Sequence, residues 1–328
     1  MEDLSASVKN AIDQRKPLID PSHRAALRLF NGFYESGVDM TIDLYGTTAL
    51  ITNHTRPPIP LPGIEPLLRE ALPWLQCILL KTRHSPDSVE KNGLILFGRE
   101  PDTSILEGGV TYALDLALHQ DASFYLDTRN LRTWLKGHAA GWQILNAFAY
   151  TGSLGAAALA GGAQRVIQLD RGRRFLDLAR RTYQLNHFPI RREDFLCRDF
   201  FPAVGALRRE GAQFDGVILD APFYSKTKGG RVDLQYESDR LINKVRPLIR
   251  DGGWLVAINN SLYKSGADYL HQLEELGAEG FLKLEEIIPV PEDVTGFPET
   301  IIRRPPVDPA PFNHPTKIAI LKIKKKSG

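Results

Sequence analysis

The stretch 143–170 constrains the fold of this chain more than any other. It begins with a short apolar run, Ile144-Leu145, passes through a turn that ends at Gly152 and an alanine-rich segment, and closes on a second apolar run that stops at Asp170. This order predicts a strand, a tight turn, a helix and a second strand, the unit of doubly wound parallel sheets. In such sheets the turn, the helix N-terminus and the acid meet at the carboxyl edge, where a nucleotide-like ligand binds and a carboxylate accepts hydrogen bonds from ribose hydroxyls.

The residues of the turn bear on which ligand this edge accepts. A dinucleotide site uses G-x-G-x-x-G, because its glycines let the backbone close around a pyrophosphate. Here Phe148, Tyr150 and Thr151 precede Gly152. Such bulky side chains fit a pyrophosphate poorly, whereas S-adenosylmethionine carries a ribose and an adenine but no phosphate. Taken alone, the stretch is also compatible with an ordinary βαβ unit.

Two motifs in this region carry a resemblance to a known family. The run N-A-F-A-Y-T-G-S-L-G at 146–155, followed by V-I-Q-L-D at 166–170, resembles the first two motifs of class I S-adenosylmethionine-dependent methyltransferases. It is most similar to the bacterial 23S ribosomal RNA base methyltransferases that make 5-methylcytosine and 7-methylguanine, whose F-Y-L-D-x-R motif is matched at 124–129. The resemblance covers most of the chain and implies an α/β fold, a Rossmann-like class I sheet of seven strands with a smaller α+β domain before it.

The resemblance also implies which residues bind S-adenosylmethionine. In class I enzymes an acid after the third strand accepts a hydrogen bond from the adenine amine, and Asp199 matches it, with Phe200 against the ring. From the residues alone, an alternative role for Asp199 is to cap the next helix. The alternative for the 124–129 motif is a structural aromatic residue with an ion pair on a helix surface. The predicted cofactor-binding residues are Tyr125, Asp127, Arg129, Asn146, Phe148, Ala149, Tyr150, Gly152, Asp170, Arg171, Asp199, Phe200 and Asp220.

A further motif, D-A-P-F at 220–223, follows a short apolar run typical of a central parallel strand. It resembles the family's D-P-P-x-F, in which a proline-stiffened loop holds an acid and carbonyl groups that orient the attacking nitrogen. Phe223 offers a face on which a flipped base can stack. Ala221 replaces the first proline and loosens the loop, and a turn without chemistry is the alternative. The predicted catalytic residues are Asp220, Pro222, Phe223 and Asn260.

The positions of the cysteines separate two chemistries within this family. Formation of 5-methylcytosine requires a thiolate to add to the ring, yet Cys77 and Cys197 both lie outside the loops expected after the fourth and fifth strands. A nitrogen lone pair needs no covalent activation. The 7-methylguanine members carry asparagines after the fifth strand, and Asn259 and Asn260 occupy that position in this sequence. We therefore predict methylation of a base nitrogen, with a slight preference for guanine. A methyltransferase for a small molecule or protein, and a noncatalytic cofactor- or RNA-binding scaffold, stay as alternatives.

Composition limits the partners and the compartment. The 328 residues include 41 basic and 39 acidic side chains, so a net charge of +2 neither requires nor excludes a nucleic-acid partner. Seven arginines between positions 171 and 192 either clamp RNA phosphates or form a solvated helix face. Two distant cysteines argue against a disulfide framework or a metal site. With no apolar run of membrane-spanning length and no signal peptide in the charged residues 1–16, we expect a cytoplasmic protein. The resemblance implies that its substrate is RNA, most simply rRNA. Monomer and homodimer stay open.

The pattern along the chain predicts two domains. We expect a lead-in over 1–20, a small α+β domain over 21–118 with a role in substrate recognition, and the methyltransferase domain over 119–328. The lead-in leaves no room for the small N-terminal RNA-binding module usual in the family, which weakens the transfer of a specific ribosomal target. Three local predictions are a hairpin at Tyr45-Gly46, a helix over 124–136 and an edge strand over 317–324. The polar segment 224–231 is expected to be a loop, either gripping substrate or disordered.

Overall fold

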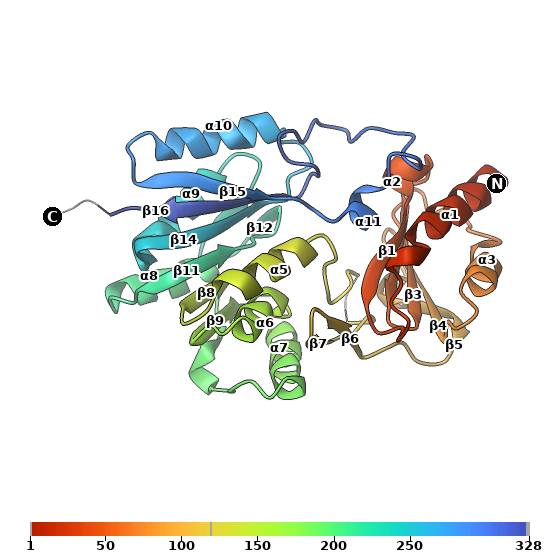
Figure 1. Cartoon of the computed structure of the whole chain (residues 1–328), viewed down its shortest axis with the longest axis horizontal. Coiled ribbons are helices and arrows are strands. Elements are labelled where there is room, and N and C mark those ends of the chain that lie inside the picture. Colours follow the sequence, from red (N-terminus) through yellow and green to blue (C-terminus); the bar gives the residue numbers. More distant parts are fainter. Residues whose placement is uncertain (1, 119, 326–328) are drawn as a thin grey trace. The chain divides into compact units, whose positions relative to one another are not determined.

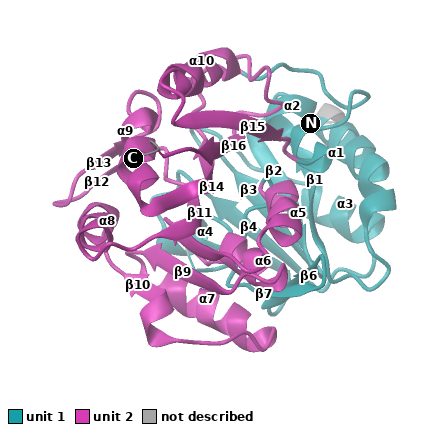
Figure 2. Cartoon of the chain, turned by 60° about the vertical axis from the view of Figure 1, so that its left-hand side comes forward, with its two compact units in different colours: residues 1–127, 291–305 teal, residues 128–290, 306–328 magenta. Residues whose placement is uncertain are grey.

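The computed structural model describes residues 2–118 and 120–325, and Figure 1 shows the course of the chain. The chain forms two compact units, coloured teal and magenta in Figure 2. Unit 1 comprises Met1–Asp127 and Pro291–Pro305, and unit 2 comprises Thr128–Val290 and Pro306–Gly328. Unit 1 therefore includes a short segment from late in the sequence. Among the described residues, no helix combines the length and the apolar character needed to cross a membrane.

Unit 1 is built on an antiparallel-rich sheet with short helices. Its elements are α1 (Glu2–Arg15), η1 (Lys16–Leu18), β1 (Ala26–Asn31), α2 (Gly32–Glu35), β2 (Met40–Tyr45), β3 (Thr48–Asn53), α3 (Ile64–Ala71), β4 (Cys77–Thr82), α4 (Ser88–Asn92), β5 (Leu94–Gly98), β6 (Ser104–Glu107), β7 (Val110–Ala113) and α11 (Glu292–Thr295). The sheet order is β1-β2-β3-β4-β5, with β6 and β7 as a separate pair. The predicted hairpin is confirmed, because Tyr45 pairs with Thr48 across Gly46, whose φ is +62°.

The late segment 291–305 completes a buried ion pair in unit 1. Arg15 is fully buried and donates to both carboxylate oxygens of Glu35, at 2.8 and 3.1 Å. The same guanidinium donates to the carbonyl oxygen of Asp293, whose carboxylate accepts a hydrogen bond from the backbone N–H of Arg28. A buried charge pair is tolerated only where its remaining polar groups are hydrogen-bonded. Unit 1 therefore needs this segment to satisfy its own core.

Unit 2 is a doubly wound α/β sandwich. Its elements are α5 (Arg129–His138), β8 (Gln143–Ala147), α6 (Ser153–Ala160), β9 (Arg165–Asp170), α7 (Arg173–Leu185), η2 (Arg192–Asp194), β10 (Phe195–Cys197), α8 (Phe200–Arg209), β11 (Phe214–Leu219), β12 (Tyr224–Lys226), β13 (Arg231–Asp233), α9 (Ser238–Val245), η3 (Arg246–Leu248), β14 (Ile249–Asn259), α10 (Gly266–Gly277), β15 (Leu282–Ile288) and β16 (Lys317–Ile323). The main sheet has the order β10-β9-β8-β11-β14-β16-β15. Its first five strands are parallel, and β16 is antiparallel to both neighbours. This Rossmann-like sheet of seven strands confirms the predicted fold class.

Successive side chains of a strand point to opposite faces of the sheet. Ile144 packs with the apolar residues of α5 and α6, whereas its neighbour Leu145 packs with those of α8, α9 and α10. Both faces are therefore covered, which explains why the central strands are apolar almost throughout. The polar side chains that end these strands are left at the carboxyl edge.

Two local predictions are wrong for identifiable reasons. The helix expected over 124–136 begins only at Arg129, because residues 123–128 form bends and a turn, in which Phe124 and Leu126 are buried and Tyr125 is exposed. The polar segment expected as a loop over 224–231 instead forms the antiparallel hairpin β12–β13, with Tyr224 paired to Asp233. The glycines and lysines of so short a segment are typical of a loop, so its sequence does not predict strands.

The strand expected at the sheet edge is also placed wrongly, because β16 lies inside the sheet between β14 and β15. Its first residue, Lys317, is fully buried, and Nζ donates to the carbonyl oxygens of Ser261 and Pro315 at 2.9 and 2.6 Å. Burial, with the nearby charge of Lys264, lowers the pKa of Lys317 to about 8. A lysine in a strand is thus not by itself a mark of an edge.

We expect Lys317 to make the free energy of unfolding rise between about pH 8 and pH 10.5. In this window the ammonium is deprotonated in the folded protein but still protonated in the unfolded chain, so the unfolded state binds more protons. Lys317→Met removes this contribution. Urea denaturation should therefore show that the free energy of unfolding of the wild type, minus that of the variant, increases as the pH rises. Lys322→Met, on the same strand but partly exposed, is the control. A difference that is independent of pH would contradict the assignment.

Candidate cofactor and substrate site

The turn after β8 has an unusual backbone. Phe148 and Tyr150 have φ of +59° and +49°, and Gly152, which precedes α6, has φ of +75°. Non-glycine residues rarely adopt this left-handed conformation, and aromatic side chains do so at a cost of about 1–3 kcal/mol. Such strain persists where the surrounding structure enforces it, and it is concentrated at functional sites. The turn is therefore marked as a site by its conformation as well as by its sequence.

A buried hydrogen-bond network beneath the turn holds it in place. Gln168 on β9 is fully buried, and its Oε1 accepts from Asn146 Nδ2 at 2.8 Å. Its Nε2 donates to the carbonyl oxygen of Gly152 at 3.3 Å and to the hydroxyl of Tyr183 at 3.0 Å. Asn146 is itself buried and serves this network, so a contact from it to the cofactor stays a prediction. Sequence reasoning missed Gln168, although a polar amide inside the apolar run V-I-Q-L-D was a signal.

Gln168→Leu should lower the free energy of unfolding by about 2–4 kcal/mol, because it leaves buried polar groups of Asn146 and Tyr183 without partners. Chemical denaturation measures the change. Gln184→Leu, at an exposed position of α7, is the matched control and should change stability by less than about 0.5 kcal/mol. Equal effects of the two substitutions would show that the network does not support the turn.

Asp170 ends β9 with its carboxylate already oriented. Oδ2 accepts from the backbone N–H of Tyr150 at 2.9 Å, and Oδ1 accepts from that of Gly172 at 2.7 Å. Burial raises the pKa of Asp170, and these hydrogen bonds offset part of the rise. Each oxygen has a further lone pair. The group is thus arranged to accept two hydroxyl hydrogen bonds, as a ribose requires.

Asp199 precedes α8 and caps it. Its Oδ1 accepts from the backbone N–H of Phe201 at 3.1 Å, so the capping interpretation is confirmed, while its role toward adenine stays a prediction. Phe200 is buried and its ring stacks on Phe148, with centroids 4.6 Å apart. The turn after β8 and the start of α8 are thus in contact through these two rings.

The loop after β11 and the end of β14 meet at the same edge of the sheet. Leu219 pairs with Ala257, and beyond them Asn260 Nδ2 lies 3.4 Å from the carbonyl oxygen of Ala221. Asn260 Oδ1 is buried and has no hydrogen-bond partner among the described residues. Buried acceptors are almost always satisfied. An unused acceptor therefore lies beside the D-A-P-F loop, open to a hydrogen bond from a water molecule or a ligand.

The remaining predicted residues are distributed over both units. Ala149 is buried, and its N–H donates to the carbonyl oxygen of Leu169, while Arg171 is exposed after β9. Arg129 begins α5 in unit 2, whereas Tyr125 and Asp127 belong to unit 1. The carboxyl edge of the unit 2 sheet thus carries the turn after β8 with Asp170, Asp199 and Asp220. Contacts of the 125–129 motif with the cofactor stay predictions.

Neither cysteine belongs to the loops after β11 and β14. Cys197 ends β10, which is separated from β11 by β9 and β8 in the sheet, a distance of three strand spacings or about 14 Å. Cys77 begins β4 in the unit 1 sheet, where burial raises the pKa of its thiol. The two loops around Asp220 and Asn260 therefore offer carboxylate and amide groups but no thiol.

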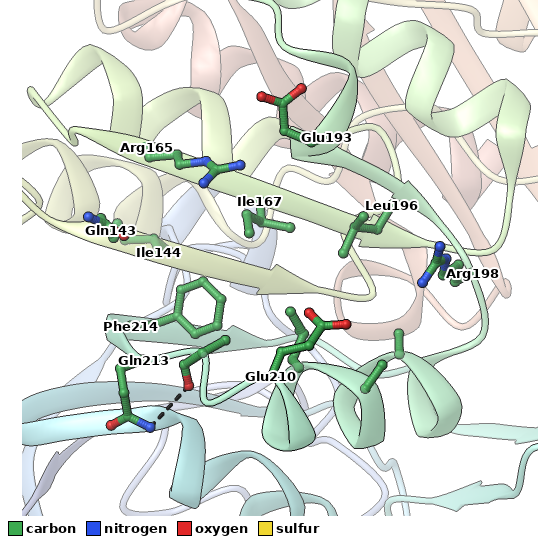
Figure 3. Close-up of a pocket in the computed structure, with 14 residues that line it drawn as sticks. Gln143, Ile144, Arg165, Ile167, Glu193, Leu196, Arg198, Glu210, Gln213 and Phe214 are labelled. Atoms are coloured by element: carbon green, nitrogen blue, oxygen red, sulfur yellow. Dashed lines mark hydrogen bonds between the residues drawn. The ribbon is translucent and has the colours of Figure 1, made fainter.

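A separate cavity of about 450 Å³ lies under α8 (Figure 3). It is lined by residues from the first halves of β8, β9 and β11, among them Ile144, Arg165 and Phe214. Glu193 and Glu210 add carboxylates to its rim, as Figure 3 shows. None of the predicted cofactor residues lines it. Apart from Leu196 and Arg198 at β10, its strand residues lie toward the amino ends of the strands, whereas ligands of such sheets bind at the carboxyl edge.

Comparison with known proteins agrees with this geometry. Residues 73–299 match the S-adenosylmethionine-dependent methyltransferase family. Ribosomal RNA large subunit methyltransferase I of Alteromonas mediterranea is 30% identical over 232 residues, which cover 67% of this chain and 57% of that protein. The chain thus spans a little over half the length of this relative, whose name agrees with the closer resemblance seen in the sequence.

Solved structures agree on the fold. The crystal structure of SMU.776 complexed with SAH (S-adenosylhomocysteine) has a TM-score of 0.80 at 22% identity, covering 97% of this chain and 82% of that one. A SAM-dependent methyltransferase from Agrobacterium tumefaciens has a TM-score of 0.62 at 16% identity, covering 92% and 90%. At these identities the likeness concerns the fold, and it is the sequence match over 73–299 that decides the relationship. The chain belongs to the S-adenosylmethionine-dependent methyltransferase family.

Proposed function

We propose that the protein transfers the methyl group of S-adenosylmethionine to a nitrogen of an RNA base, in ribosomal RNA and in the cytoplasm, with a slight preference for guanine. In this proposal Asp170 binds the ribose hydroxyls, Asp199 binds the adenine amine, and the strained turn at 148–152 surrounds the methionine part. Asp220, Pro222, Phe223 and Asn260 form the substrate side. The relative from Alteromonas mediterranea is named a ribosomal RNA methyltransferase, which supports RNA as the substrate class.

The observation that carries the proposal is the unused acceptor of Asn260 beside the D-A-P-F loop. Together with the Asp220 carboxylate it offers two acceptors at one edge of the sheet. The Watson–Crick edge of guanine presents two donor groups, an imino N–H and an amine, whereas the corresponding edges of adenine and cytosine each present one. Paired acceptors therefore favour guanine. The partly exposed ring of Phe223 offers the base a surface for stacking.

The chemistry needs no covalent intermediate. The lone pair of the base nitrogen attacks the methyl carbon, the bond from that carbon to sulfur breaks, and neutral S-adenosylhomocysteine leaves as the base gains the positive charge. Alignment of the two reactants and exclusion of water account for most of the rate enhancement in such a displacement. Asp220 would hold the base in line and stabilise the charge that develops on it.

Mass spectrometry of nucleosides from ribosomal RNA tests the proposal, with wild-type and deletion strains compared. One N-methylated base, most simply a methylguanine, should disappear on deletion and return with the wild-type gene but not with an Asp220→Ala gene. If no methylated base disappears from the RNA, the RNA assignment fails. If 5-methylcytosine disappears, the assignment to a nitrogen fails.

A further inference from the structure

Exposed aromatic rings in the described part of unit 2 come from two neighbouring segments. Among the described residues of this unit, the aromatic side chains that are exposed are Phe223, Tyr224, Tyr236 and Tyr263, with 39%, 54%, 71% and 65% of their surface accessible. All four come from the hairpin region 223–236 or from the loop after β14. Exposed apolar side chains that gather in one place mark a binding surface. We call these four residues the aromatic platform.

Hydrogen bonds bring the segments of the aromatic platform together. The backbone N–H of Leu234 donates to the carbonyl oxygen of Phe223 at 3.0 Å, and Asn259 Nδ2 donates to that of Leu234 at 2.9 Å. Lys264 Nζ donates to the carbonyl oxygen of Gln235 at 3.1 Å, which joins the loop after β14 to the segment before Tyr236. The rings of Phe223 and Tyr263 have centroids 6.1 Å apart.

The hairpin that carries part of the platform is anchored at both ends. Its base continues the D-A-P-F loop, and the backbone at Gly229 and Gly230, between β12 and β13, lies against the Asp199 side chain and the Phe201 ring so closely that neither glycine has room for a Cβ. The platform thus extends from the predicted base site and is attached beside the acid predicted to bind adenine. A surface held in this way is preorganised for a ligand.

The charges around the platform suit a polyanion. Lys226 and Lys228 are exposed and have no ion-pair partner among the described residues. Of the acids on the following segment, Glu237 is engaged by both Arg231 and Arg240, and Asp233 Oδ1 accepts from the backbone N–H of Tyr236. Alternating rings and basic groups form the surface on which single-stranded nucleic acid binds, because bases stack on aromatic faces while lysines contact the phosphates.

We infer that the aromatic platform binds single-stranded RNA on either side of the target base, with Tyr236 and Tyr263 stacking on the flanking nucleotides and Lys226 and Lys228 contacting phosphates. This inference rests on the proposed function, since it concerns how the same RNA substrate is held. It selects unpaired RNA over a duplex, because paired bases have no free faces to stack on these rings.

Fluorescence anisotropy with a labelled single-stranded RNA of about 12 nucleotides tests the inference, in the presence of S-adenosylhomocysteine and with a duplex of the same sequence as comparison. Tyr236→Ala/Tyr263→Ala should raise the Kd for the single strand about tenfold or more. Tyr236→Phe/Tyr263→Phe keeps the rings and should bind as wild type. Lys226→Gln/Lys228→Gln should lower the slope of log Kd against log salt concentration by about 1.4.

The possible outcomes separate this inference from the proposed function. Equal single-strand affinity in wild type and the alanine variant, or wild-type affinity no higher for the single strand than for the duplex, overturns the inference even if methyl transfer to RNA occurs. Ring-dependent binding of the single strand supports it, and the nucleoside measurement then decides separately whether a base is methylated. Calorimetry should show unchanged S-adenosylhomocysteine affinity in every variant, which excludes loss of the fold as the cause.

Discussion

Asp170→Asn should raise the Kd for S-adenosylhomocysteine about 100-fold or more, because two hydrogen bonds from ribose hydroxyls to an ionised acceptor are weakened together. The substitution preserves the shape of the side chain. Its single oxygen can accept from the N–H of Tyr150 or of Gly172 but not from both, so the amide nitrogen faces the other donor. Isothermal titration calorimetry measures the affinity.

The control for this experiment is Asp177→Asn, which changes an exposed acid on α7 that pairs with Arg180 at the surface. It should leave the affinity unchanged. Circular dichroism without ligand checks that Asp170→Asn is folded. Tight uptake of NAD by the wild type, with none of S-adenosylmethionine or S-adenosylhomocysteine, would show that the carboxyl edge holds a pyrophosphate and would reject the cofactor assignment.

Asp220→Ala should lower kcat for RNA methylation about 100-fold or more, because it removes a preorganised negative charge from the site where positive charge moves from sulfur to the base. S-adenosylmethionine carries a positive sulfonium and S-adenosylhomocysteine does not. The variant should therefore lose more affinity for the first than for the second. Single-turnover transfer of a labelled methyl group measures the rate, and calorimetry measures both affinities.

Asp239→Ala removes a carboxylate in the first turn of α9 and is the matched control, expected to retain the wild-type rate. If Asp220→Ala keeps wild-type kcat, the acid acts at most as a helix or loop anchor. If instead the variant loses equal affinity for S-adenosylmethionine and S-adenosylhomocysteine, Asp220 contributes to the structure of the pocket and not through its charge.

The central βαβ unit was predictable because each of its signals is local. An apolar run that stops at Asp170 specifies a strand and an acid at its end, and the observed β9 ends there. The turn residues at Phe148 and Tyr150 could be named from the resemblance, but their left-handed backbone could not, since aromatic residues have no preference for it. That conformation is imposed by the surrounding fold, including the network around Gln168.

Features that depend on which segments pair were beyond the sequence. The alternation of Lys317–Ile323 is compatible with an edge strand or a central one, and only its pairing with both β14 and β15 decides between them. The hairpin β12–β13 is short and polar, so its strands have no apolar pattern to reveal them. Its contact with Asp199 through two glycines likewise depends on tertiary structure.

The return of residues 291–305 to unit 1 bears on how the protein can be dissected. A fragment that stops at residue 127 contains Arg15 and Glu35 but not the carbonyl of Asp293 that shares the guanidinium, nor the carbonyl of Val294 that accepts from Asn31. In such a fragment the Arg15–Glu35 ion pair would be exposed to water. A stable isolated unit 1 therefore requires the late segment to be supplied as a grafted peptide, and a stable isolated unit 2 requires a linker across the gap from 290 to 306.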